Sequence, residues 1–196
     1  MSKSDPSTSK RERNKTVRWV ITIFLVTILV SGTISFISDE IMAASSVFVA
    51  FLILLAIVFL GIIFDVVGVA VTSADEKPFH SMAARKVTGA QEAIRLLRNA
   101  ERVSSICNDV VGDICGVVSG AASATIAAQV LQNMEFTMPR LITLVMSALV
   151  AGLTVGGKAI GKTFAINSCT TIVHTVGKIV WSFRHIPQIF KKRDKQ

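Results

Sequence analysis

Residues 103–131 read VSSICNDVVGDICGVVSGAASATIAAQVL, and this stretch decides the fold. It contains no Lys, Arg, Glu or Pro, and it is long enough to cross a bilayer, because a transmembrane helix needs about 20 apolar residues. Its two carboxylates, Asp109 and Asp113, are four residues apart and therefore share one helix face. A carboxylate inside a membrane helix is costly, so the pair marks a candidate functional site.

Small residues recur along the same stretch at every fourth position: Gly112, Gly116, Gly120, Ala124 and Ala128. This spacing lets a second helix backbone approach closely. The ladder therefore predicts a packing face. Its partner is either a second copy of the chain, which would make a homodimer, or another span of the same chain.

Long apolar runs also dominate the rest of the chain. Its 196 residues are 51% hydrophobic, and the mean hydropathy is +0.58. This composition predicts an all-α, polytopic membrane protein, with four transmembrane helices near residues 19–38, 43–73, 103–131 and 141–162. A signal peptide is the competing interpretation of the first run, but its length and the lack of a clear cleavage motif favour a retained helix.

The segments between and beyond the spans are basic. Residues 77–102 have a helical period and predict a juxtamembrane helical segment that is broken near Gly89. The alternative interpretation is an ordinary solvated helix. Residues from 167 onward predict a C-terminal amphipathic helix. The predicted organisation is a disordered basic tail (1–18), an extra N-terminal transmembrane helix (19–42), a membrane domain (43–184) and a second basic tail (185–196).

The basic residues predict an orientation. Six lie in the N-terminal tail, six in residues 77–102 and eight from Lys158 onward, whereas the two other loops hold only Arg140. The positive-inside rule therefore predicts a multi-pass protein of the cell membrane with both termini in the cytoplasm. Since the basic segments flank membrane spans, we expect them to meet anionic lipid at the cytoplasmic face rather than nucleic acid.

Five polar residues fall at one level, in the inner half of the membrane, because a helix rises 1.5 Å per residue. Charges that faced lipid would each cost about 2.5–3.5 kcal/mol. We therefore expect these residues to face one another in a single polar cavity: Asp65, Asn108, Asp109, Asp113 and Lys158. The sequence holds no defensible catalytic arrangement of Ser, Cys or His and no phosphate-binding loop, so an enzyme is not expected.

Four segments match the motifs of one family in order, spacing and helix placement. Residues 63–73 read IFDVVGVAVTS where the family has F-F-S-G-S-E-T-A-L-T-S, and residues 96–102 read LLRNAER where it has L-L-x-x-P-E-R. CNDVVG at 107–112 corresponds to G-N-x-x-x-N, and GKAIGKTFA at 157–165 to G-E-x-x-P-K-T-L-A. The region from about 47 to 184 thus resembles the transmembrane domain of the cyclin M / CorB / CorC magnesium transporters.

The resemblance implies a dimer and an inner-half site for Mg²⁺ or another divalent cation, with no other cofactor. The hypothetical ligands are Asp65, Asn108, Asp109 and Asp113, with Lys158 as a counter-charge. Of these, Asp109 and Asp113 have no counterpart in the family. The family's two serines become Asp65 and Val67, its first glutamate Gly68, its second asparagine Gly112 and its late glutamate Lys158.

A lysine makes a cation site electrostatically poorer, and the family's cytoplasmic nucleotide-binding module has no counterpart in this sequence. Two functions therefore stay open. One is cation transport, alone or as a transporter subunit. The other is a membrane structural or interaction protein on the same fold, in which the charges form a salt-bridged cluster and nothing is transported.

Overall fold

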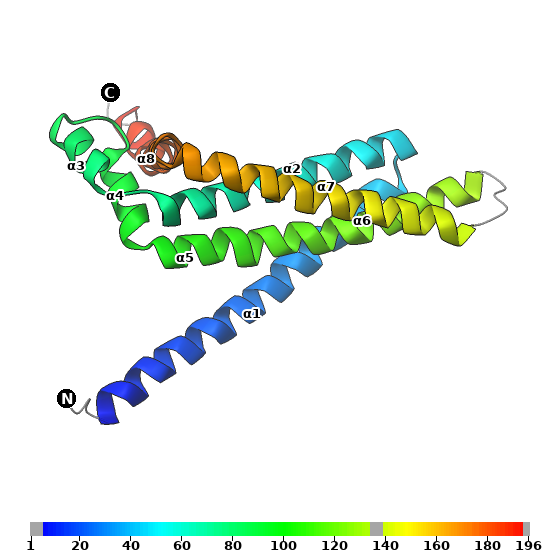
Figure 1. Cartoon of the computed structure of the whole chain (residues 1–196), viewed down its shortest axis with the longest axis horizontal. Helices are drawn as coiled ribbons and strands as arrows, with labels where there is room; N and C mark the ends of the chain where they lie inside the picture. Colours follow the sequence, from blue (N-terminus) through cyan, green and yellow to red (C-terminus); the bar gives the residue numbers. More distant parts are fainter. Residues whose placement is uncertain (1–5, 134–138, 194–196) are drawn as a thin grey trace.

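The computed structural model describes the backbone of residues 6–133 and 139–193, and the side chains of residues 17–42, 44–132 and 140–184. All regular elements in these ranges are helices (Figure 1). Four helical stretches are long and apolar enough to cross a membrane, which confirms the all-helical, four-span prediction: Val17–Met42, Val47–Ser73, Ala100–Gln132 and Arg140–Asn167.

Helix α1 (Pro6–Ala43) is longer than the sequence predicts and diverges from the other spans (Figure 1). The prediction of a disordered tail is wrong for residues 6–18, which are helical. Proline suits the first position of a helix, and an existing helix adds residues at little cost. Near its other end, Met42 is buried, and its carbonyl oxygen accepts a hydrogen bond of 2.8 Å from Gln129 Nε2.

Helix α2 (Val47–Ser73) is the centre of the bundle and packs against both α6 (Asp113–Asn133) and α7 (Pro139–Asn167). These three helices run side by side in Figure 1. The glycine-rich part of α7 stays helical. Its Gly157 and Gly161 face Ile62 and Val66 of α2, so these glycines serve tight packing rather than a break. An apolar cluster holds together the half of the bundle where α1 meets α2: Met42, Ala50, Leu54, Val58, Ala122, Ile126 and Val150.

At the other end of the bundle lie α3 (Lys77–Ala84), α4 (Ala90–Arg98) and α8 (Cys169–Arg193), as Figure 1 shows. Gly89 separates α3 from α4 with a left-handed φ of 84°. Helix α8 continues beyond residue 184, so residues 185–193 are helical and not a separate tail. A second apolar cluster joins this end to the spans: Ala70, Val71, Phe79, Ala93, Leu97, Ala165 and Val173.

The third span is built from three consecutive elements. It begins with α5 (Ala100–Ser105), continues as the π-helix η1 (Ile106–Gly112) and ends as α6. The π-helix spans the segment that the sequence marks as a candidate site. Because π-helical segments are rare and are frequent at functional sites, this local geometry marks residues 106–112 as a candidate functional segment.

Candidate functional site

The predicted polar residues lie between the two apolar clusters. Helix α2 contributes residues 50–58 to the first cluster and residues 70–71 to the second, and Asp65 falls between them. Asn108 and Asp109 belong to η1, and Lys158 to α7. The core of the bundle is therefore interrupted by one polar level, to which α2, η1 and α7 all contribute.

Asp65 and Lys158 form an ion pair at this level. Lys158 Nζ lies 3.8 Å from Asp65 Oδ1, and the two side chains are 27% and 17% exposed, respectively. Gly112 of η1 lies beside the ammonium group: a Cβ there would be in ordinary van der Waals contact with Nζ, at 3.4 Å. Each charge offsets the other, which lowers the cost of holding either one inside a membrane. Lys158 is thus the counter-charge of Asp65.

Asn108 lies one helical turn nearer the α3–α4 end and packs against Gly68 of α2. A Cβ at position 68 would lie 2.7 Å from Asn108 Cγ, so the close approach requires glycine. The amide nitrogen of Asn108 donates a hydrogen bond of 3.2 Å to Ser104 Oγ. Its Oδ1 is buried without a hydrogen-bond partner among the described residues. Such an orphaned acceptor costs about 1–3 kcal/mol, so a donor or cation there would be stabilising.

Neighbouring polar side chains of η1 point in different directions, as consecutive residues of any helix do. Asn108 faces α2, whereas Asp109 is exposed and accepts a hydrogen bond of 2.8 Å from Ser105 Oγ. Asp113 is exposed as well. Asp109 and Asp113 therefore point out of the bundle rather than toward Asp65. Among the side chains that the structure describes, no three His, Cys, Asp or Glu groups gather closely enough to hold a metal ion.

The small-residue ladder has two kinds of surroundings. Gly112 faces Lys158, whereas a Cβ at Gly116 or Gly120 would meet nothing within 4 Å. The two alanines that continue the ladder are exposed. Within the chain, Gly112 therefore packs against another helix, but the face of α6 that carries Gly116 and Gly120 stays open.

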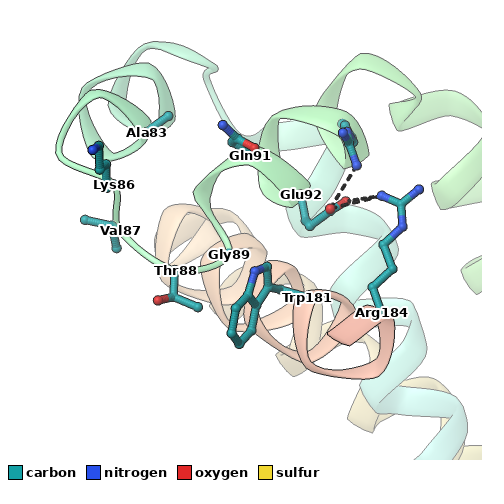
Figure 2. A pocket seen from close by; sticks show the side chains of 10 residues that line it. Ala83, Lys86, Val87, Thr88, Gly89, Gln91, Glu92, Trp181 and Arg184 are labelled. Carbon is teal, nitrogen blue, oxygen red and sulfur yellow. Dashed lines mark hydrogen bonds and ion pairs between the residues drawn. The ribbon is translucent and has the colours of Figure 1, made fainter. Parts of the chain in front are cut away.

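A second charged cluster, which the sequence analysis missed, lies at the α4–α8 contact. The Glu92 side chain is only 10% exposed and accepts hydrogen bonds from Arg95 Nη1 at 2.9 Å and from Arg184 Nη1 at 3.0 and 3.2 Å. Figure 2 shows Glu92 facing Arg184 across the two helices. Helical spacing could have found the Arg95 contact, but no local signal links Glu92 to a residue 92 positions away.

Comparison of the chain with protein-family models, curated proteins and solved structures found no match. Its function is therefore inferred from its own residues and their geometry.

Proposed function

We propose that this chain is a membrane structural or interaction protein with the architecture of the cyclin M / CorB / CorC membrane domain, in which the ammonium of Lys158 takes the place of a divalent cation. The observation that carries the proposal is the 3.8 Å pair between Lys158 and Asp65. The residues at the family's motif positions support it, because Asp65 belongs to this pair, Gly112 lies beside it and Asn108 lies one turn from it.

Electrostatics explains why a tethered ammonium replaces the ion. At about 4 Å and an effective dielectric constant of about 20, an ammonium repels a divalent cation by roughly 8 kcal/mol. One carboxylate at the same distance attracts the cation by roughly the same amount, so the two terms cancel. Mg²⁺ also prefers near-octahedral oxygen coordination, whereas this level offers the Asp65 carboxylate and the Asn108 carbonyl oxygen beside the ammonium.

In this function the charges hold the bundle together and the open face of α6 meets a partner. The ion pair joins α2 to α7 inside the membrane. We propose that the open part of the ladder, at Gly116 and Gly120, packs against a second copy of the chain in a homodimer. Support comes from the empty space beside these glycines and from the close helix approach that small residues permit.

Divalent-cation transport, alone or as a transporter subunit, is the second candidate. One observation favours it: Asn108 Oδ1 is buried and lacks a partner among the described residues. An amide oxygen next to a carboxylate is a hard donor set of the kind that Mg²⁺ accepts. In this candidate function, the Lys158 ammonium leaves Asp65 when the ion enters. Neither candidate requires catalysis or a resident cofactor.

For membrane placement, we propose the cell membrane with both termini cytoplasmic and with α3, α4 and α8 at the cytoplasmic surface. The distribution of basic residues supports this orientation. The described start of α1 and the helices α3, α4 and α8 also lie toward the same end of the long axis, as four spans require (Figure 1).

A substitution at Lys158 separates the two candidates. Lys158→Glu restores the residue that the family carries. If Lys158 replaces the ion, Mg²⁺ does not stabilise the wild-type protein, and the variant unfolds more easily without rescue by Mg²⁺. If the site transports a cation, Mg²⁺ raises the melting temperature of the wild type and raises that of the variant further.

A further inference from the structure

A cavity of about 490 Å³ opens where the α3–α4 turn and α4 meet α8 (Figure 2). This volume is within the range of about 300–1,000 Å³ that is typical of small-ligand sites. Lys86 and Thr88 line it from the turn, Arg95 from α4, and Trp181 and Arg184 from α8. It lies at the end of the bundle, well away from the Asp65–Lys158 pair.

The cavity is cationic. Three basic side chains and one carboxylate, Glu92, line it, so its net charge is +2. Glu92 contacts only Nη1 of each arginine, and the Arg95 and Arg184 side chains are 58% and 60% exposed. A guanidinium has five N–H donors in a planar fork. The pairing with Glu92 therefore fixes both arginines in place and leaves N–H groups for another acceptor.

Contacts between the α3–α4 turn and α8 fix the walls of the cavity relative to each other. Gly89, in the turn, packs against Gly177 of α8, and His174 of α8 lies with Nε2 3.1 Å from the Thr88 carbonyl oxygen. Lys86 adopts a left-handed φ of 56°, which is uncommon for a residue other than glycine. The contact between turn and helix thus presents Lys86 and Arg184, which are distant in sequence, to the same cavity.

We propose that this cavity binds a phosphate ester group, carried either by an anionic lipid headgroup or by a soluble phosphate. Arg95 and Arg184 donate to the phosphate oxygens, since a guanidinium fork matches phosphate geometry. Lys86 lies on the other side of the cavity from Arg184 in Figure 2, so it adds positive charge at longer range. The Thr88 hydroxyl is a further hydrogen-bond donor in the lining. The inference does not depend on whether the chain moves a cation.

The surroundings favour the lipid source. Ile179 and Phe183, four residues apart on α8, are 50% and 70% exposed and share one face, whereas Trp181, which lines the cavity, points to nearly the opposite side of the helix. In the proposed membrane placement, these apolar side chains lie beside acyl chains while the cavity receives the headgroup. Tryptophan is enriched at this depth of the membrane.

The test uses the purified full chain in a neutral detergent at about 150 mM salt, where exposed charges are screened beyond about 8 Å. Native mass spectrometry and the melting temperature report the binding of short-chain phosphatidylglycerol, with phosphatidylcholine of the same chain length as the lipid control. Glycerol 3-phosphate and inorganic phosphate serve as the soluble probes. Lys86→Gln removes a cation from the cavity, and Arg85→Gln removes the neighbouring exposed cation that does not line it.

We expect phosphatidylglycerol to bind the wild type and Lys86→Gln to weaken its binding about fivefold, the upper end of what one exposed charge contributes. Arg85→Gln should weaken it less than about threefold, and both variants should melt like the wild type without lipid. Competition by glycerol 3-phosphate or inorganic phosphate that depends on Lys86 identifies a soluble source as sufficient, and its absence identifies the lipid. Equal losses in the two variants, or no preference for phosphatidylglycerol and no phosphate binding, overturn the proposal.

Discussion

The backbones of Gly89 and Gly177 lie in direct contact. A Cβ at Gly177 would lie 2.6 Å from the Gly89 carbonyl oxygen and 3.0 Å from the Ala93 nitrogen, and a Cβ at Gly89 would lie 2.6 Å from the Lys178 nitrogen. Two residues without side chains thus join the α3–α4 turn to α8. This contact positions α8 so that Arg184 reaches Glu92.

Gly177→Ala should loosen α8. The added methyl group meets backbone atoms that cannot rotate away, and overpacking of this kind costs about 1–3 kcal/mol. We expect faster amide hydrogen exchange in residues 169–184 and a lower melting temperature. Gly156→Ala is the matched control, since a Cβ there meets nothing within 4 Å and alanine favours the helix. Equal exchange in both variants would show that the contact does not hold α8.

Lys158→Met should destabilise the protein by about 2 kcal/mol or more, because it leaves Asp65 unpaired inside the membrane. The double variant Asp65→Asn, Lys158→Met removes both charges and should recover at least half of that loss. Reversible unfolding in mixed micelles measures these free energies. Lys162→Met, at an exposed position one turn along α7, is the control and should have little effect. Strict additivity of the two single changes would mean that the pair is not coupled.

Membrane orientation can be tested by labelling single cysteines in a variant that lacks Cys107, Cys115 and Cys169. A membrane-impermeant reagent added to intact cells should modify cysteine at position 39, in the last turns of the first span, and not at position 85, between the second and third spans. Asp39 and Arg85 are both exposed, so access depends on the side of the membrane. Labelling at position 85 from outside would exclude the proposed orientation.

The proposed homodimer can be tested by substituting two glycines that face open space in the described part of the chain. Leucine at Gly120 on α6 or at Gly152 on α7 meets no atom of the same chain within 4 Å of its Cβ. If the ladder is the interface, Gly120→Leu should convert the dimer to a monomer with little change in the melting of the monomer, whereas Gly152→Leu should leave the dimer intact. Light scattering in detergent measures the mass. A Gly120→Leu protein that keeps the wild-type mass would show that the ladder is not the interface.

The spans and the polar level were predictable because they depend on composition and on the rise of the helix. Long apolar runs identify four membrane helices, and the rise per residue places Asp65 and Lys158 at one depth. The helical extension of α1 back to Pro6 was missed, since a polar, charged sequence of that kind also suits a disordered segment.

The directions of individual side chains were not predictable. A regular helix predicts that Asp109 and Asp113 share a face, which agrees with their common exposure. Only the packing of Asn108 against Gly68 reveals that Asn108 is the one that faces α2. The Glu92–Arg184 contact depends on how α8 folds back onto α4, and no short-range pattern encodes it. Depth along a membrane helix is therefore easier to predict than the direction of a side chain around it.

The most direct test of the central claim, that the Lys158 ammonium replaces a divalent cation, is the melting temperature of purified protein in Mg²⁺, compared with an ionic-strength-matched choline salt. The measurement includes the wild type, Lys158→Glu and the control Lys162→Glu. We predict no Mg²⁺-specific shift in the wild type or in Lys162→Glu, and a destabilised Lys158→Glu protein that Mg²⁺ does not rescue. A Mg²⁺-specific rise in the wild type that Asp65→Asn abolishes would contradict the claim.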